Sequence, residues 1–114
     1  MEYNGKSHNE IYKMLGRGKE TEMKKSHLQE RQTIESEGGF LELEYYLVEE
    51  ETKSQAIYGI GVKKKHSFQG KLRFENEETG GLSAKKETVL QLIEVLARNY
   101  ITPMCLNEVV DDYL

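Results

Sequence analysis

The sequence has a single cysteine and no long apolar run. Cys105 cannot form an intramolecular disulfide, which argues against a secreted fold stapled by disulfides. The most apolar stretch, residues 89–97, is interrupted by Gln91 and Glu94 and is too short to cross a bilayer. The first ten residues lack the basic and apolar regions of a signal peptide. We therefore expect a cytoplasmic protein that does not associate with membranes.

Residue types that form metal and catalytic sites are few and scattered. His8, His27, His66 and Cys105 lack the spacing of a zinc site. Cys105 lies at the start of a predicted helix, where a thiol pKa can be lowered, but a catalytic thiol also needs a base and an oxyanion site. We therefore expect a non-enzymatic protein with no catalytic residues, no metal site and no cofactor.

The composition changes near residue 39. Residues 1–39 mix charges of both signs with few large apolar side chains, so they bury too little surface to offset their ordering entropy. They are predicted to form a flexible, mostly disordered arm that folding does not require. One short helix is predicted at residues 8–15, where Ile11, Met14 and Leu15 share a face. These three residues are candidate contacts for a protein partner.

From residue 40 onward, apolar and polar residues alternate, which is typical of β-strands. The alternation predicts three strands, at residues 40–47, 56–62 and 68–75, with residues 63–66 as a turn. Short polar connections between consecutive strands favour an antiparallel meander. Gly59 and Gly61 fall on the outer face of the second strand, which predicts a bulge or the close approach of another backbone.

Two helical patterns follow the strands. The first is an apolar stripe formed by Val89, Leu92, Ile93, Leu96 and Tyr100. The second begins at Thr102-Pro103, a favourable helix start, and its stripe is Leu106, Val109, Val110 and Tyr113. Two helices can cover one face of the sheet, so residues 40–114 are predicted to be a small α+β domain.

The strand and helix periodicities converge on one predicted core. Its members are Leu41, Leu43, Tyr45, Leu47, Tyr58, Ile60, Val62, Phe68, Leu72, Phe74, Val89, Leu92, Ile93, Leu96, Leu106, Val109 and Val110. A three-stranded sheet covered in this way leaves its edge strands exposed, which invites pairing with another chain or another copy.

The formal net charge of −4 is not that of a typical nucleic-acid-binding protein. The main basic concentration lies around the second and third predicted strands and comprises Lys63, Lys64, Lys65, Lys71 and Arg73. These residues are candidate contacts for the backbone of RNA or DNA. Lysines on an edge hairpin also discourage aggregation, so nucleic-acid binding and protection of the edge both stay open as interpretations.

Three motifs mark the C-terminal part of the chain. They are Tyr58-Gly59-Ile60, the junction formed by Asn99, Thr102 and Pro103, and the acidic-aromatic-leucine tail at residues 109–114. Together, over residues 40–114, they resemble a small bacterial family, the domain of unknown function 6514. The resemblance supports the domain boundary and implies a source among spore-forming, low-GC bacteria. It implies no activity.

These observations favour a protein-interaction or regulatory module that binds a protein partner or forms a homo-oligomer. The alternative is a weak nucleic-acid-binding protein that uses the basic hairpin at residues 63–71.

Overall fold

Four consecutive strands form one antiparallel sheet within residues 21–114, the part of the chain that the computed structural model describes. They are β1 (Thr21–Ser36), β2 (Gly39–Thr52), β3 (Ala56–Phe68) and β4 (Lys71–Ser83). Each strand pairs with the next, so the order in the sheet is β1-β2-β3-β4 and the topology is the predicted meander.

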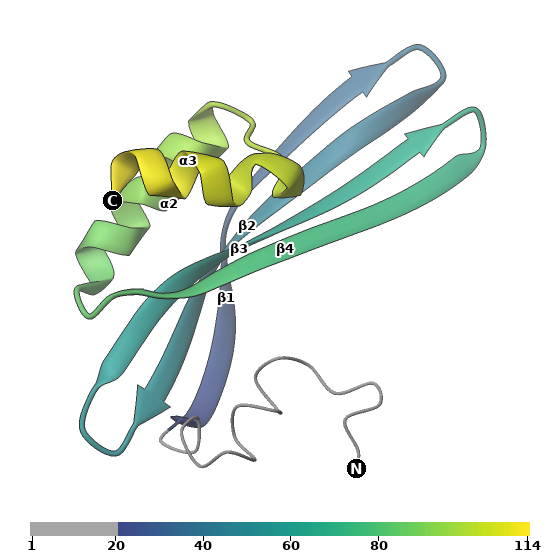
Figure 1. The fold of residues 1–114 in the computed structure, drawn as a ribbon. Helices are drawn as coiled ribbons and strands as arrows, with labels where there is room; N and C mark the ends of the chain where they lie inside the picture. The colour runs from purple at the N-terminus through teal and green to yellow at the C-terminus, as the bar shows by residue number, and fades with distance from the viewer. Residues whose placement is uncertain (1–20) are drawn as a thin grey trace.

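The helices follow the sheet and pack on one of its faces, which is called the inner face (Figure 1). They are α2 (Lys86–Arg98) and α3 (Leu106–Tyr113), preceded by a 3-10 turn, η2 (Pro103–Cys105). Figure 1 shows both helices near the middle of the long strands, while the hairpins extend beyond them. The predicted α+β class and the two C-terminal helices on one face are therefore confirmed.

The prediction of three strands is wrong, because β1 lies inside the segment that was predicted to be an arm. β1 pairs with β2 from Thr21↔Thr52 to Ser36↔Gly39. A register shift between Leu28 and Glu30 breaks its two-residue period. Its side chains are mostly polar and exposed, so its place in the sheet depends on ladder hydrogen bonds that no apolar pattern reveals.

Side chains also tie β1 to the rest of the domain. The Gln32 Nε2 amide donates to the backbone carbonyl of Ala97 at 3.1 Å, near the C-terminal end of α2. The same carbonyl accepts the backbone N–H of Tyr100 at 3.1 Å, so Gln32 adds a second donor at the C-terminal end of the helix. β1 therefore contacts the helical layer as well as β2, and the arm boundary at residue 39 does not coincide with the edge of the folded region.

The inner face of the sheet is buried only where the helices cover it. The buried cluster contains most of the predicted core residues, namely Leu43, Tyr45, Leu47, Ile60, Val62, Val89, Leu92, Ile93, Leu96, Leu106 and Val110, together with Ala97. Three further predicted members, Leu41, Tyr58 and Val109, are partly buried against it. The hydroxyl of Tyr45 donates to the carbonyl of Ile101 at 2.8 Å, which links the sheet to the connection between the helices. Burial raises the pKa of Tyr45 well above its usual value.

Three predicted core residues are exposed instead, which is a second correction. The exposed fractions are 47% for Phe68, 50% for Leu72 and 67% for Phe74. All three lie near the β3–β4 turn, beyond the helices. Leu72 and Phe74 also face away from the helices, because Phe74 pairs with Lys65 and that lysine lies on the opposite face from Val62.

The predicted turn at residues 63–66 is also wrong, since β3 continues to Phe68. The actual turn is Gln69–Gly70, where both residues have positive φ (52° and 81°), as a tight two-residue hairpin requires. The backbone N–H of Gln69 donates to the carbonyl of Gly38 at 2.8 Å, so the β1–β2 and β3–β4 turns support each other. The expectation at Gly59 is met, because a Cβ there would collide with the Thr79 carbonyl oxygen.

Truncation tests the contribution of β1 directly. A chain of residues 37–114 is expected to melt at least about 10 °C below a chain of residues 21–114, because the loss of β1 exposes one edge of β2 and removes the Gln32 contact. Thermal unfolding followed by circular dichroism measures the difference. Midpoints within a few degrees of each other would instead support the original prediction that this segment does not contribute to folding.

Candidate functional site

The outer face of the sheet, opposite the helices, is closed at its centre and open near the β3–β4 turn. At the centre Val48 is buried, and it lies within van der Waals reach of the position that a Cβ on Gly61 would take. An ion pair between Lys24 of β1 and Glu78 of β4 spans the sheet there. Because β1 and β4 are opposite edges of the sheet, this contact shows that the sheet curves toward its outer face.

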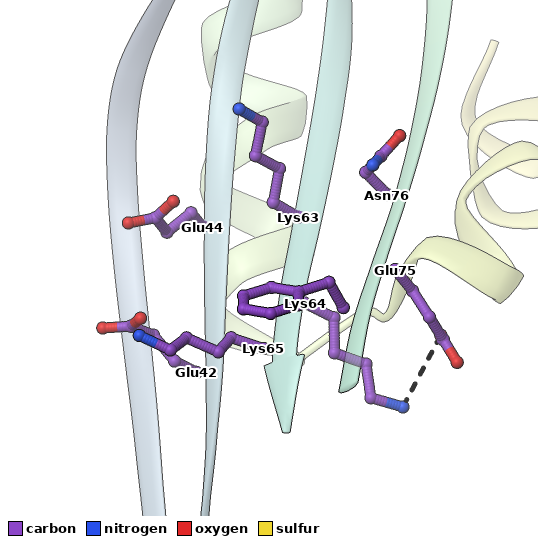
Figure 2. Close-up of a pocket in the computed structure, with 8 residues that line it drawn as sticks. Glu42, Glu44, Lys63, Lys64, Lys65, Glu75 and Asn76 are labelled. Atoms are coloured by element: carbon purple, nitrogen blue, oxygen red, sulfur yellow. Dashed lines mark ion pairs between the residues drawn. The ribbon is translucent and has the colours of Figure 1, made fainter. Parts of the chain in front are cut away.

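The open part of the outer face contains a shallow hollow of about 260 Å³ (Figure 2). Its lining residues come from the three strands β2, β3 and β4, and they are Glu42, Glu44, Lys63, Lys64, Lys65, Phe74, Glu75 and Asn76. The sheet register sets this arrangement, since Lys63 lies between Glu44 and Asn76 and Lys65 lies between Glu42 and Phe74. Each row therefore places a carboxylate of β2 next to a lysine of β3.

Glu44 accepts side-chain hydrogen bonds through both of its carboxylate oxygens. One oxygen accepts from the Arg31 guanidinium at 2.7 Å, and the other accepts from the Tyr46 hydroxyl at 2.8 Å. The Tyr46 hydrogen bond, followed by the Arg31 hydrogen bond, holds the pKa of Glu44 below its usual value. The same bond to Glu44 raises the pKa of Tyr46. Glu44 therefore stays ionised at neutral pH.

Two of the predicted basic contacts lie over aromatic rings on the outer face. The ammonium of Lys63 is 4.8 Å from the ring centroid of Tyr46, and that of Lys65 is 5.9 Å from the ring centroid of Phe40. Cations in these positions are attracted by the faces of the rings. In Figure 2, both side chains extend toward the strand that carries Glu42 and Glu44.

The other three predicted basic contacts lie on the opposite side of the β3–β4 hairpin. Lys64 forms an ion pair with Glu75 at 3.7 Å and points away from Lys63 and Lys65 (Figure 2). Arg73 pairs with His66 and Lys71 with Phe68 in the ladder, which places both on the same side as Lys64. The five cations therefore share one hairpin but not one surface.

The exposed apolar group at the β3–β4 turn is the feature that sequence reasoning missed. It assigned Phe68, Leu72 and Phe74 to the core because their alternation resembles that of a half-buried strand. The length of the strands explains the exposure, but the strands predicted from the sequence were too short to reveal it. A 13-residue strand such as β4 spans about 43 Å, whereas the 13 residues of α2 span about 20 Å, so the helices cannot cover it all.

The remaining predicted site residues do not gather into a reactive centre. Within residues 21–114, no group of three or more His, Cys, Asp and Glu side chains is placed to hold a metal ion. His27 contacts Glu49 at 3.4 Å, and Cys105 is half-buried at the end of η2. The candidate partner contacts at residues 11, 14 and 15, and the helix predicted at 8–15, lie outside the described residues. No helix in the described part is long and apolar enough to span a membrane.

The fold defines an α+β domain made of a four-stranded meander with two helices on one face. Residues 24–114 match the family of unknown function DUF6514, so the chain belongs to that family. The match confirms the resemblance seen in the C-terminal motifs and extends it into β1. No curated protein and no solved structure matched the chain.

Removing the Tyr46 hydroxyl tests the electrostatics of the outer face. In Tyr46→Phe, the pKa of Glu44 is expected to rise toward the ordinary value of about 4.3, because the largest cause of its lowering is gone. NMR titration of the Glu44 side-chain carboxyl measures this. Tyr113→Phe, on α3, serves as the control and should leave the pKa of Glu44 unchanged.

The sign of the stability effect follows from this lowered pKa. Glu44 stabilises the folded state above its unfolded pKa, and this contribution is lost as the pH falls through the folded value. Glu44→Gln should therefore destabilise the domain at neutral pH and have a diminishing effect at acidic pH. An ordinary pKa for Glu44 in the unmodified protein would contradict this account.

Proposed function

We propose that this domain is a non-enzymatic protein-interaction module whose contact surface is the β3–β4 hairpin together with the free edge of β4. The observation that supports this most directly is the exposure of Leu72 and Phe74 on the outer side of this hairpin, with Phe68 exposed on its inner side. Large apolar side chains that are exposed among charged neighbours are typical of a surface that binds another protein.

The backbone of β4 adds to this surface. β4 is the last strand of the sheet, so one side of it pairs with β3, and within residues 21–114 no strand pairs with its other side. Its pairing with β3 is unbroken from Phe68↔Lys71 to Gly61↔Glu78. The opposite edge strand, β1, has register shifts between Thr21 and Met23 and between Leu28 and Glu30. A regular edge can accept an additional strand, whereas bulges oppose such pairing.

Affinity capture from an extract of the source organism, followed by binding measurements with the purified partner, tests this proposal. The double substitution Leu72→Ser/Phe74→Ser is expected to weaken binding at least about 10-fold, since exposed aromatic anchors dominate such contacts. Met104→Ser, in η2, is a matched control because Met104 is also highly exposed. Equal binding by both variants, or equal loss, would rule out the hairpin as the contact surface.

A second candidate function, weak binding of nucleic acid, is favoured by one observation. Lys63, Lys65 and Phe74 line the same hollow, and cations next to an exposed ring suit single-stranded RNA or DNA. Against this, Glu42 and Glu44 lie between the lysines and β1, and repel phosphate.

Salt dependence separates the two candidates. A nucleic-acid-binding domain should lose affinity for a single-stranded RNA linearly with the logarithm of salt concentration. Lys63→Ala should then reduce that slope by about one, whereas Lys86→Ala, at the start of α2, should not change it. Fluorescence anisotropy measures both slopes. Absence of salt-dependent binding would remove this candidate and leave the protein-interaction module.

A further inference from the structure

The charges on β4 change sign at Phe74, with cations before this residue and carboxylates after it. Lys71 and Arg73 precede this residue by three positions and one position, and Glu77 and Glu75 follow it by the same intervals. Alternate residues of a strand share a face, so the four charges lie on the inner side of β4. Leu72, Phe74 and Asn76 lie on the outer side. The segment at residues 71–77 is therefore charge-complementary to its own reverse.

Two copies of this segment fit together as an antiparallel pair with a two-fold axis at Phe74. Lys71 then lies opposite Glu77 of the second copy, and Arg73 lies opposite Glu75 of the second copy. The symmetry produces each of these pairs twice. Phe74 lies opposite Phe74 of the second copy on the other face. Opposite charges and aromatic rings in directly opposed positions both stabilise antiparallel pairs.

We infer that β4 is a self-association edge, which joins two copies of this chain into one continuous eight-stranded sheet with Phe74 on the two-fold axis. This inference rests on the proposed function and names its partner as a second copy. A two-fold arrangement uses the same patch on both copies and is closed, so it gives a dimer at this edge.

The charges select this register over its neighbours. A shift by two residues in one direction places Arg73 opposite Arg73 of the second copy. A shift by two residues in the other direction places Glu75 opposite Glu75 of the second copy. Like charges in directly opposed positions destabilise the pair. A shift by one residue turns the outer face of one copy to the inner side of the other. The register centred on Phe74 is the one that avoids both penalties.

The local contacts of these residues leave the edge available. Within residues 21–114, no ion pair shorter than 4.0 Å involves Arg73, whose neighbour on β3 is His66. Glu75 contacts Lys64 at 3.7 Å and stays half-exposed, so it can bridge Lys64 and Arg73 of the second copy. The charge pairs between copies would therefore add to the contacts inside each copy.

The helical layers do not obstruct this pairing. α3 approaches β4 near Glu77, where the Asn107 side-chain amide lies 3.4 Å from the Glu77 carboxylate. In the antiparallel register, Glu77 faces Lys71 of the second copy, which is next to that copy's Gln69–Gly70 turn. Figure 1 shows that this end of β4 extends away from both helices. The helices of the two copies would then lie at opposite ends of the shared edge.

Disulfide trapping in the full-length chain tests the axis, with Cys105→Ser as background and oxidised glutathione as oxidant. Phe74→Cys should form a covalent dimer at least about 10-fold faster than Leu72→Cys, since only residue 74 meets its own copy. The two copies of residue 72 would lie about 14 Å apart along the strands, beyond the span of a disulfide. Equal rates for the two variants, or no dimer with Phe74→Cys, would overturn the inference.

Charge reversal gives a second measurement that needs no cysteine. Arg73→Glu places like charges opposite each other and should raise the dimer dissociation constant at least about 10-fold. The swap Arg73→Glu/Glu75→Arg restores opposite pairs and should recover much of the loss, whereas Lys86→Glu should have no effect. Sedimentation velocity over roughly 1 µM to 1 mM suits an interface of this small size.

The outcomes separate this inference from the proposed function. A swap variant that dimerises no better than Arg73→Glu would overturn the dimer. If another protein is captured through Leu72 and Phe74 while the chain stays monomeric at all concentrations, the dimer is also overturned. In that second case the proposed interaction surface stands with a different partner.

Discussion

A helical layer shorter than the sheet beneath it is the constraint on which the rest of this structure depends. Strands of 13 to 16 residues extend about 43–53 Å, while α2 covers about 20 Å of that length. Apolar burial is therefore concentrated at the crossing, around Tyr45, Ile60 and Leu96. Beyond it, the sheet is held by its backbone ladder, by tight turns and by side chains on the surface.

The surface of the sheet follows from this unequal coverage. At the centre of the outer face, Val48 is buried next to Gly61, and an ion pair between Lys24 and Glu78 spans the sheet. Toward the β3–β4 turn, nothing in residues 21–114 covers Phe74, and the nearby cations are matched by Glu42, Glu44 and Glu75. The local charge is thus nearly balanced, which suits a protein surface better than a phosphate backbone.

The sequence predicts the parts of this fold in which apolar residues follow a clear helix or strand periodicity. The stripe through Leu92 and Leu96 and the alternation through Leu43 and Tyr45 give the helices, the central strands and most of the core, because burial on one face imposes the period. β1 could not be predicted in this way, since its bulge near Leu28 and its polar composition remove the alternation of apolar and polar residues. The direction of Phe74 could not be read either, because it depends on where the chain turns, and Gln69 is not a typical turn residue.

Amide hydrogen exchange at two protein concentrations tests the central claim most directly, namely that the helices stabilise the middle of the sheet and leave the β4 edge to pair with a second copy. In dilute protein, amides of β2 and β3 near Tyr45 and Ile60 should exchange slowest, and outward-facing amides of residues 71–77 should exchange fast. At high concentration the amides at 71–77 should become protected while those of β1 do not change. Protection at 71–77 that is independent of concentration, or that rises equally in β1, would contradict the account.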